Sequence, residues 1–440
     1  MKSYGPKKRN TAEQTESNKK SKSQANTKKN GMIKLTPRAH NFVIDLKGEL
    51  RDLTMVPGDG SIVIDPTDDD SWGIDPFYAL DDSSSDTEIY KVMSTIAISL
   101  IPQMKGDNAF FSDQARELLK GCFVYFYARG YRTFTEVLRQ TLSQPIKQTI
   151  QEIIESADPG SPAYISVIDF AEIKSPEDGE KTPSIETSET VMNIFMNFKS
   201  KAAVLLADED LARCLDKKDK AFYPELLLDH DVYFCVPKHR VAQYAQLCFM
   251  TLNQTFLWIL GLEELSKAKM YGRERLPIGI VLDEVVALLS GMGGKLSELI
   301  NVLRLARSVG CMVIVCVQST SGLRCVYSDD EVDDILSNLA YRVYLDATTP
   351  ATQKQISESA GTYKEAKVTY SSTDQRSTRT MVYEDKPIVE PSDLITLGSS
   401  DEAIMISTRT GYCRMKKVPY YKESFYRRIA DFIRDKKLGI

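Results

Sequence analysis

Histidine and paired cysteines are scarce in this sequence, and their scarcity narrows the kinds of site that it can build. The three histidines, His40, His230 and His239, do not have the spacing of metal ligands. The eight cysteines include no Cys-x-x-Cys pair, and most of them lie inside apolar runs. We therefore expect buried free thiols in a reducing compartment, rather than zinc ligands or disulfides.

Long hydrophobic runs and a strong excess of one charge are also missing. A membrane helix needs about 20 apolar residues in a row; the closest stretch, residues 247–262, contains Asn253 and Gln254 and is typical of an interior helix. No apolar segment follows the basic residues of the N-terminus, so no signal peptide is expected. A net charge of −5 excludes a polycation, so nucleic acid would be bound only through local patches. The sequence thus predicts a cytosolic or peripherally bound protein.

The composition fits a soluble protein with more than one core. With 440 residues, 42% of them hydrophobic and 27% charged, two domains are the default expectation. Residues 1–31 are rich in Lys, Asn, Ser, Thr and Gln and have few large apolar side chains, which predicts a disordered basic tail. Its lysine clusters could touch nucleic acid or lipid head groups, or could simply be solvated.

Two adjacent carboxylates follow a short apolar run in the middle of the chain. Residues 278–282 are apolar and partly β-branched, which predicts a buried parallel strand, and Asp283 and Glu284 come directly after it. In P-loop nucleotide hydrolases the first acid at such a strand end holds the magnesium ion, and a following Glu can polarise water. The pattern therefore predicts a Walker B strand. A plain strand–helix–strand unit with an acidic loop is the alternative.

The segment after these acids continues the same unit. Residues 296–309 have apolar side chains at helical spacing and carry Arg304 and Arg307, and Gly310 follows where a left-handed cap is expected. Residues 311–317 form a second apolar run that ends at Gln318. A right-handed crossover between two parallel strands places the polar residues at their carboxyl ends on the edge where such sheets bind ligands.

The periodicity changes along the chain and predicts its domains. Residues 42–44 and 61–64 are expected as opening strands, and Asp45, Lys47 and Glu49 crowd the turn after the first. Helical spacing then dominates residues 87–101, 114–128, 134–142, 146–154 and 191–211. Later we expect a strand at 231–236, a helix at 243–267, a helix from 328 to 339, a strand at 342–345, hairpins at 363–383 and 402–418, and a basic helix at 422–437.

An α/β fold with a mostly parallel sheet, interrupted by an inserted all-α domain, follows from this order. The expected boundaries are 32–86 and 221–421 for the two parts of the sheet domain, 87–220 for the helical insertion, and 422–440 for the terminal helix.

The order of these parts resembles the type IV secretion coupling proteins, the TraG/TraD-type conjugative DNA-transfer ATPases. The resemblance extends from about residue 41 to 421. It is carried by Asp283-Glu284 and by these segments: Val43-Ile-Asp-Leu-Lys-Gly-Glu-Leu50, Leu305-Ala-Arg-Ser-Val-Gly310, residues 313–319, Ile335-Leu-Ser-Asn338, Glu390-Pro-Ser-Asp-Leu394 and Lys417-Val-Pro-Tyr-Tyr421.

This resemblance implies a RecA-like P-loop NTPase motor, with ATP and Mg²⁺ as cofactors, assembled as a homo-hexameric ring on a plasmid-type or integrative-element conjugation system. Such rings lie at the cytoplasmic face of the inner membrane; without a membrane helix of its own, this chain is expected to be peripheral there. The implied partners are single-stranded DNA with its relaxase, the type IV secretion channel and accessory proteins.

The resemblance also assigns roles to single residues. Asp283 is expected to hold magnesium, Glu284 to orient the attacking water, and Gln318 to sense the γ-phosphate. Arg307 is expected to reach a neighbouring subunit's nucleotide as an arginine finger. Asp45 and Lys47 match a family motif; a structural role near the site and a direct role at the cofactor both stay open. Arg304 is expected to support packing or an ion pair, and Phe110-Phe111, an aromatic pair seen in the family, to lie in the core.

One motif of the family is missing, because Gly-x-x-x-x-Gly-Lys-Ser/Thr does not occur in the sequence. Gly294-Lys295 is a decoy, since Leu289 and Leu296 stand where the first glycine and the hydroxyl are required and the loop follows the wrong strand. Without backbone amides and a lysine on the phosphates, ATP binding loses most of its energy. The sequence therefore predicts an ATPase-impaired coupling-protein-like subunit, truncated or split and acting with a partner. A non-catalytic adaptor that presents substrate through the helical domain, or another RecA-like DNA translocase, are the alternatives.

Overall fold

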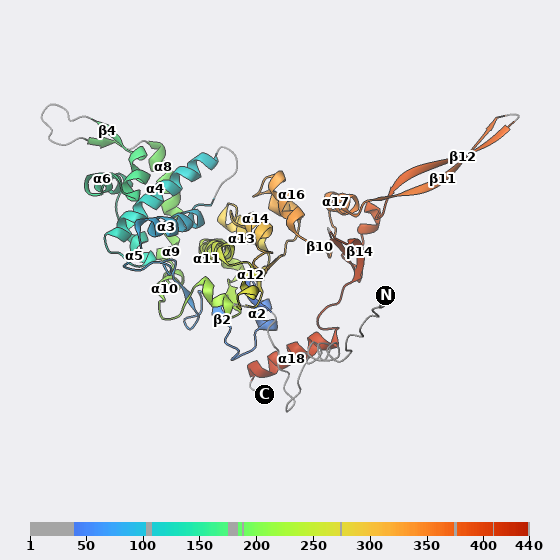
Figure 1. Ribbon diagram of the computed structural model, residues 1–440, viewed down its shortest axis with the longest axis horizontal. Coiled ribbons are helices and arrows are strands. Elements are labelled where there is room, and N and C mark those ends of the chain that lie inside the picture. Colours follow the sequence, from blue (N-terminus) through green and yellow to red (C-terminus); the bar gives the residue numbers. More distant parts are fainter. Residues whose placement is uncertain are drawn as a thin grey trace, which may run out of the picture.

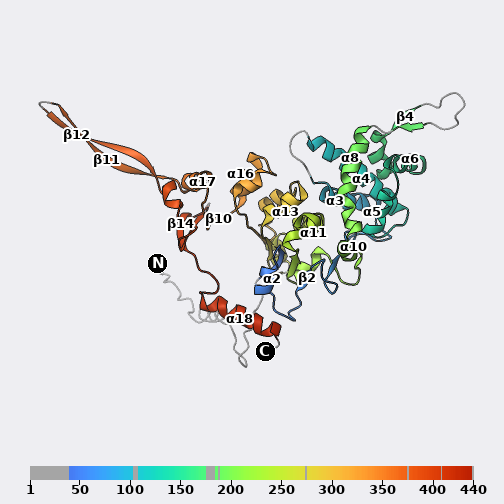
Figure 2. The same ribbon diagram turned by 180° about the vertical axis from the view of Figure 1, so that it is seen from behind.

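A computed structural model describes residues 39–102, 108–174, 184–186, 189–272, 275–373, 376–407 and 409–438. The chain is elongated in both views: a group of helices lies at one end, a sheet with its covering helices lies in the middle, and a long β-hairpin projects from the other end (Figures 1 and 2).

The central sheet has five strands, all parallel, in the order β2-β7-β1-β8-β9. The strands are β1 (His40–Asp45), β2 (Ile62–Ile64), β7 (Val232–Cys235), β8 (Ile278–Leu282) and β9 (Cys311–Val315). Each coincides with an apolar run that the sequence predicted as a strand, to within a few residues. The predicted α/β fold with a parallel sheet is therefore confirmed, and β1 lies at its centre with β8 as its neighbour.

The helices that cover the sheet come mostly from the second half of the chain. They are α2 (Glu49–Thr54), α11 (Val241–Gly261), α12 (Leu265–Met270), α13 (Val285–Met292) and α14 (Leu299–Leu305), with the 3-10 turns η2 (Pro224–Leu228) and η3 (Lys238–Arg240). The single helix expected over 243–267 is wrong, because Leu262 and Glu264 are extended and separate α11 from α12. Most residues of α11 are buried, as expected for an interior helix.

In the described part of the chain between β2 and β7, eight helices gather at one end of the molecule (Figure 1). Ser85 and Glu88 form a capping box at the start of α3, and Thr133 and Glu136 do the same for α5. Residues 191–211, where helical spacing was expected, lie in three successive helices. The helices are α3 (Asp86–Leu100), α4 (Asn108–Ala128), α5 (Phe134–Ser143), α6 (Ile146–Ser156), α7 (Pro162–Val167), α8 (Glu189–Ala202), α9 (Val204–Ala207) and α10 (Glu209–Asp216).

Short strands accompany these helices. β3 (Gly73–Ile74) pairs with β6 (Ala221–Phe222) in parallel, and β4 (Glu172–Lys174) pairs with β5 (Ser184–Glu186) in antiparallel orientation, next to η1 (Ile168–Phe170).

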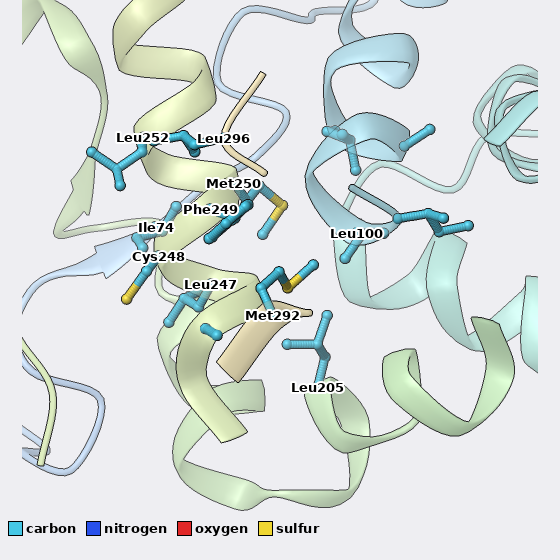
Figure 3. Close-up of a cluster of buried hydrophobic side chains, with 14 of the residues drawn as sticks. Ile74, Leu100, Leu205, Leu247, Cys248, Phe249, Met250, Leu252, Met292 and Leu296 are labelled. Carbon is cyan, nitrogen blue, oxygen red and sulfur yellow. The ribbon is translucent and has the colours of Figure 1, made fainter. Parts of the chain in front are cut away.

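One continuous hydrophobic core joins the helical group to the sheet. Figure 3 shows α11 in its middle, where Phe249 and Met250 lie among Met292 of α13, Leu100 of α3 and Leu205 of α9. Side chains of α11 also tie the two parts together by hydrogen bonds, from Asn253 Nδ2 to Ser99 Oγ (3.0 Å) and from Gln254 Nε2 to the carbonyl of Pro76 (2.7 Å). The domain limits given above stay a prediction.

The expectation that Phe110 and Phe111 lie in the core is wrong. Both rings are exposed (62% and 45%) and stack edge to face on each other. They stand near the start of α4. The expectation of buried thiols holds for half of the cysteines. All eight are free, but only Cys122, Cys214, Cys235 and Cys248 are buried.

The C-terminal third forms a second, antiparallel sheet in the order β10-β13-β14, with a core of its own. Ser328 caps α16 through a capping box with Glu331, as its sequence predicted. The elements are α15 (Thr320–Arg324), α16 (Asp329–Asn338), β10 (Tyr341–Tyr344), α17 (Pro350–Ala360), η4 (Pro391–Leu394), β13 (Glu402–Ser407) and β14 (Gly411–Lys416).

Two further elements extend from this sheet. β11 (Thr362–Thr373) and β12 (Arg376–Pro387) form the long projecting hairpin, and α18 (Ser424–Leu438) lies beside α2 (Figure 1). Lys437 Nζ of α18 contacts Asp52 Oδ1 of α2 at 3.1 Å. Among the residues that the structure describes, none of the helices is long and apolar enough to cross a membrane.

Candidate functional site

The parallel sheet brings several predicted residues to one edge. Asp45 is the last residue of β1, and Asp283 and Glu284 follow the neighbouring strand β8. The N–H of Asp283 donates to the carbonyl of Ile44 (3.3 Å), so the ends of the two strands are held together. This is the carboxyl edge, where α/β sheets bind ligands.

An ion pair joins the two strand ends: Lys47 Nζ lies 2.6 Å from Glu284 Oε1. Glu284 is also the only non-glycine residue with a positive φ in the described part of the chain (φ 48°, ψ 40°). A left-handed conformation costs roughly 1–2 kcal/mol for an L-residue with a Cβ. Such strain persists where the surroundings fix it, and it gathers at functional sites.

Asp45 supports the turn that carries Lys47. Its side chain is fully buried, and its carboxylate oxygens accept hydrogen bonds from the N–H of Lys47 (3.3 Å) and of Arg51 (2.8 Å). Gly48, with φ 74°, permits the sharp change of direction into α2. Asp45 therefore acts through the backbone of this turn, which fixes where the Lys47 ammonium can reach.

The charges at this edge influence one another. Burial raises the pKa of Asp283, and the negative charge of Glu284 raises it further. The hydrogen bond from Lys47 lowers the pKa of Glu284, and the same bond raises the pKa of Lys47. The pair is therefore ionised at neutral pH. Asp283 is the carboxylate that gains most from an added cation.

Asp283 fits a magnesium ion only if other ligands arrive with it. Mg²⁺ is usually held by one or two carboxylates together with waters and phosphate oxygens. In the described ranges there is no group of three or more His, Cys, Asp or Glu that could hold a metal ion. The donor set at Asp283 thus suits a metal ion that is bound together with a phosphate ligand.

Gln318 and Arg307 lie at different places relative to this edge. Cys316 N–H donates to the carbonyl of Leu282 (2.9 Å), so the chain that leads from β9 to Gln318 leaves beside the end of β8, and Gln318 is exposed. Arg307 is exposed in the turn before β9, at the amino end of that strand. Five strand residues at ~3.3 Å each separate it from the carboxyl edge. Within one chain, Arg307 does not join the other predicted residues.

Two basic residues near the site have clear structural settings. Arg304 forms an ion pair with Asp334 of α16, as expected. Lys295 Nζ lies 2.6 Å from Glu331 Oε1 and Gly293 caps α13, so the Gly-Gly-Lys loop ties two helices together. Sequence reasoning missed Lys238, whose charge contributes to the lowered pKa of Glu284. Its place just after the strand Val232–Cys235 was the signal that could have found it.

A parallel sheet with an acid pair at the end of an inner strand, interrupted by helices, is the arrangement of a RecA-like P-loop NTPase fold. The family model described as "Type IV secretory system Conjugative DNA transfer" matches residues 38–435. The chain belongs to this family of conjugative DNA-transfer coupling proteins.

Solved structures of a bacterial coupling protein have the same fold. The unbound TrwBdeltaN70 is 18% identical and aligns with a TM-score of 0.62 over 86% of this chain and 78% of its own. TrwB in complex with a non-hydrolysable GTP analogue gives 0.63 at 16% identity (87% and 79%), and TrwB with ADP and Mg²⁺ gives 0.61 at 17% identity (86% and 78%). Comparison with curated proteins gave no match.

Proposed function

We propose that this coupling protein recruits a relaxase with its attached single-stranded DNA and drives its passage into a type IV secretion channel, with ATP and Mg²⁺ bound at the carboxyl edge of the parallel sheet. The observation that carries the proposal is the acid pair Asp283-Glu284 held beside Lys47 at that edge. The solved TrwB structures with ADPNP and with ADP and Mg²⁺ support nucleotide as the cofactor.

In this proposal each side chain has a separate task. Asp283 holds the magnesium ion, which neutralises charge on the phosphates when bound. Lys47 has one ammonium for two acceptors, Glu284 and a phosphate oxygen, and Asp45 fixes the turn from which it reaches both. When Lys47 turns to the phosphate, Glu284 is released and can orient a water molecule. Gln318 senses the γ-phosphate from the end of the neighbouring strand.

Arg307 requires a second subunit in this scheme. It lies at the opposite edge of the sheet from Asp283, exposed to solvent. An exposed arginine on the far side of a motor subunit can complete only a neighbour's site, which supports a homo-hexameric ring with residues 32–86 and 221–421 as motor and 87–220 as the substrate-binding insertion. The ring would lie at the cytoplasmic face of the cell membrane.

A non-catalytic adaptor is the second candidate. Two observations favour it: the sequence has no Gly-x-x-x-x-Gly-Lys-Ser/Thr, and Glu284 is engaged by Lys47. In that case the helical insertion would present substrate, and the sheet would bind nucleotide weakly or not at all.

Titration of the purified protein with a fluorescent ATP analogue separates the two candidates. The motor predicts Mg²⁺-dependent binding that is lost in Asp283→Ala and kept in Glu284→Gln. Asp330→Ala, an acid in the first turn of α16, is the control that should leave binding unchanged. No saturable binding up to millimolar nucleotide would overturn the nucleotide role of this chain acting alone.

A further inference from the structure

The helix α10 of the helical insertion is bound to the loops that follow two neighbouring strands of the parallel sheet, β2 and β7. Its Arg213 donates from Nη2 to the carbonyl of Pro66 (3.0 Å), and Arg213 Nη1 lies 3.0 Å from Asp69 Oδ1; both partners follow β2. Its Asp210 accepts at Oδ2 a hydrogen bond from Arg240 Nη1 (3.2 Å), and Arg240 lies in the turn η3 that follows β7. The insertion therefore contacts the carboxyl edge of the sheet at two places.

Several contacts fix η3 to the start of α10. Arg240 Nη1 also donates to the hydroxyl of Tyr244 (2.7 Å), and its guanidinium lies 5.9 Å from the centre of that ring. Three residues after Arg240, Gln243 Nε2 donates to Asp208, the residue that caps α10. Arg240 of η3 and Gln243 of α11 thus both hold the amino-terminal end of α10, so we expect η3 and α10 to move together.

The turn η3 also carries a lysine to the edge of the candidate site. β7 pairs with β1 in parallel, and Val236 N–H, just after β7, donates to the carbonyl of Asp45 (3.4 Å), the last residue of β1. Lys238 therefore leaves the sheet beside the turn that follows β1. Its side chain is exposed, and its positive charge acts on Glu284, which follows the strand on the other side of β1.

We propose that Asp210 is a positioning residue for the nucleotide-binding edge, acting through Arg240. It holds η3 where the Lys238 ammonium faces the phosphates of a nucleotide bound at Asp283. The inference rests on the function proposed above. Phosphates attract a nearby ammonium, and a cation that is already held in place loses less conformational freedom when it meets them. Breaking the contact between Arg240 and Asp210 should therefore weaken nucleotide binding, although neither residue follows the strand that carries the two acids.

This link works in both directions, because the coupling between two binding events is reciprocal. If the position of α10 affects the affinity for nucleotide, bound nucleotide must also steady α10. The helical insertion, to which the proposed function assigns substrate binding, would thereby respond to nucleotide at the sheet. The contact on η3, rather than the one on the loop after β2, is the connection that transmits this response.

The first test is binding of the fluorescent ATP analogue, with Mg²⁺, to the full-length protein. Lys238→Met should weaken binding by about tenfold, as expected when a charge-assisted contact is lost. Asp210→Ala and Arg240→Met should each weaken it as well, and neither should add to the effect of Lys238→Met, because all three act at one point. Asp69→Ala, the matched control, breaks the ion pair between α10 and the loop after β2 and should leave the affinity unchanged.

The second test is amide hydrogen exchange at saturating analogue. Exchange within residues 209–216 should become slower in the wild type and in Asp69→Ala. This slowing should be lost in Asp210→Ala, Arg240→Met and Lys238→Met. Thermal unfolding of each variant checks that its fold is kept, and Arg240→Met breaks the contact from the sheet side if Asp210→Ala disturbs α10 itself.

The outcomes separate this inference from the proposed function. Wild-type affinity in Lys238→Met would overturn the inference and leave the function in place. A loss in Asp210→Ala that adds to the loss in Lys238→Met would also overturn the inference, because Asp210 would then support the fold in general. Failure of the wild type to bind the analogue would instead overturn the nucleotide role of the sheet edge, and the inference with it.

Discussion

Lys47 Nζ lies 2.6 Å from Glu284 Oε1, so the turn after β1 is tied directly to the residue that precedes α13. Glu284 is both a strained residue and a restrained one. Its backbone is left-handed, and its carboxylate is held by a cation from the turn after β1. Each of these two properties can be tested by substitution.

The ion pair should give stability a defined pH dependence. The folded pKa of Glu284 is lowered, so the stability from this group is present above the ordinary Glu value of ~4.3 and is lost as pH falls through the lower folded pKa. The pKa of Lys47 is raised in the folded protein. Its contribution to stability is therefore fully present below the ordinary Lys value of ~10.4 and is lost as pH rises through the folded pKa. Thermal unfolding of Lys47→Met should therefore differ from that of the wild type between about pH 5 and 10, and the two should converge as pH falls through the lowered pKa of Glu284.

The difference in that pH window should be small, because the lysine side chain is about one-third exposed (32%) and exposed pairs stabilise weakly. Lys354→Met, which removes a wholly surface pair with Glu358, is a control without a strained partner. A Lys47→Met difference that does not shrink as pH falls below the ordinary Glu value of ~4.3 would contradict the ion pair as its cause.

The left-handed backbone of Glu284 predicts an unusual order of stability. Glycine adopts this conformation without a Cβ penalty, so Glu284→Gly should be more stable than Glu284→Ala by about 1 kcal/mol in urea unfolding. At Asp283, whose φ is not positive, the alanine variant should instead be more stable than the glycine variant. If Glu284→Ala proved more stable than Glu284→Gly, this would show that the backbone strain is relieved in solution.

The shared core predicts that one side chain stabilises both the sheet and the helical insertion. Phe249 is fully buried in α11, and its loss should cost about 3–5 kcal/mol as Phe249→Ala. Leu257→Ala, on the same helix at a side chain that is 41% exposed, should cost much less. Limited proteolysis of Phe249→Ala should expose cleavage sites in α3–α10 and around the sheet together. Selective release of the helical part alone would argue for separate cores.

Arg307 and Arg304 are expected to differ in what their loss changes. Arg304→Ala breaks the ion pair with Asp334, so it should slightly lower the stability of the α14–α16 contact. Arg307→Ala should leave thermal unfolding unchanged, because the residue is exposed, and should lower ATP hydrolysis only in assembled protein. Mixing Arg307→Ala with Glu284→Gln subunits tests this directly: some activity should return in mixed rings, since intact neighbouring sites can form. Loss of activity in Arg307→Ala monomers would contradict a role in trans.

The sequence predicted those parts of the fold that depend on local patterns. β8 matches its predicted bounds because its apolar run is closed by Pro277 and by Asp283. The start of α16 follows from Ser328 and Glu331, which form a capping box within one turn. By contrast, the break between α11 and α12 has no strong breaker apart from Gly261, because the residues between the helices, Leu262, Glu263 and Glu264, are good helix formers.

The contacts within the site were harder to predict. That Lys47 meets Glu284 depends on β1 lying beside β8, and a single sequence holds no signal for which strands are neighbours. The structural role of Asp45 became clear only from its burial and its two N–H donors. The position of Arg307 at the far edge follows from its place just before β9 and from the parallel pairing of β9 with β8.

The terminal helix α18 lies against α2, and α2 begins two residues after Lys47. Lys437 also contacts Asp52 in that helix, so α18 steadies the helix that directly follows the turn of Lys47. An affinity tag or binding partner fused behind α18 would therefore press on the turn that carries Lys47 from outside. Purification handles are better placed elsewhere, and a molecule that binds this helix has a route to shift Lys47 relative to Glu284 without contacting either residue.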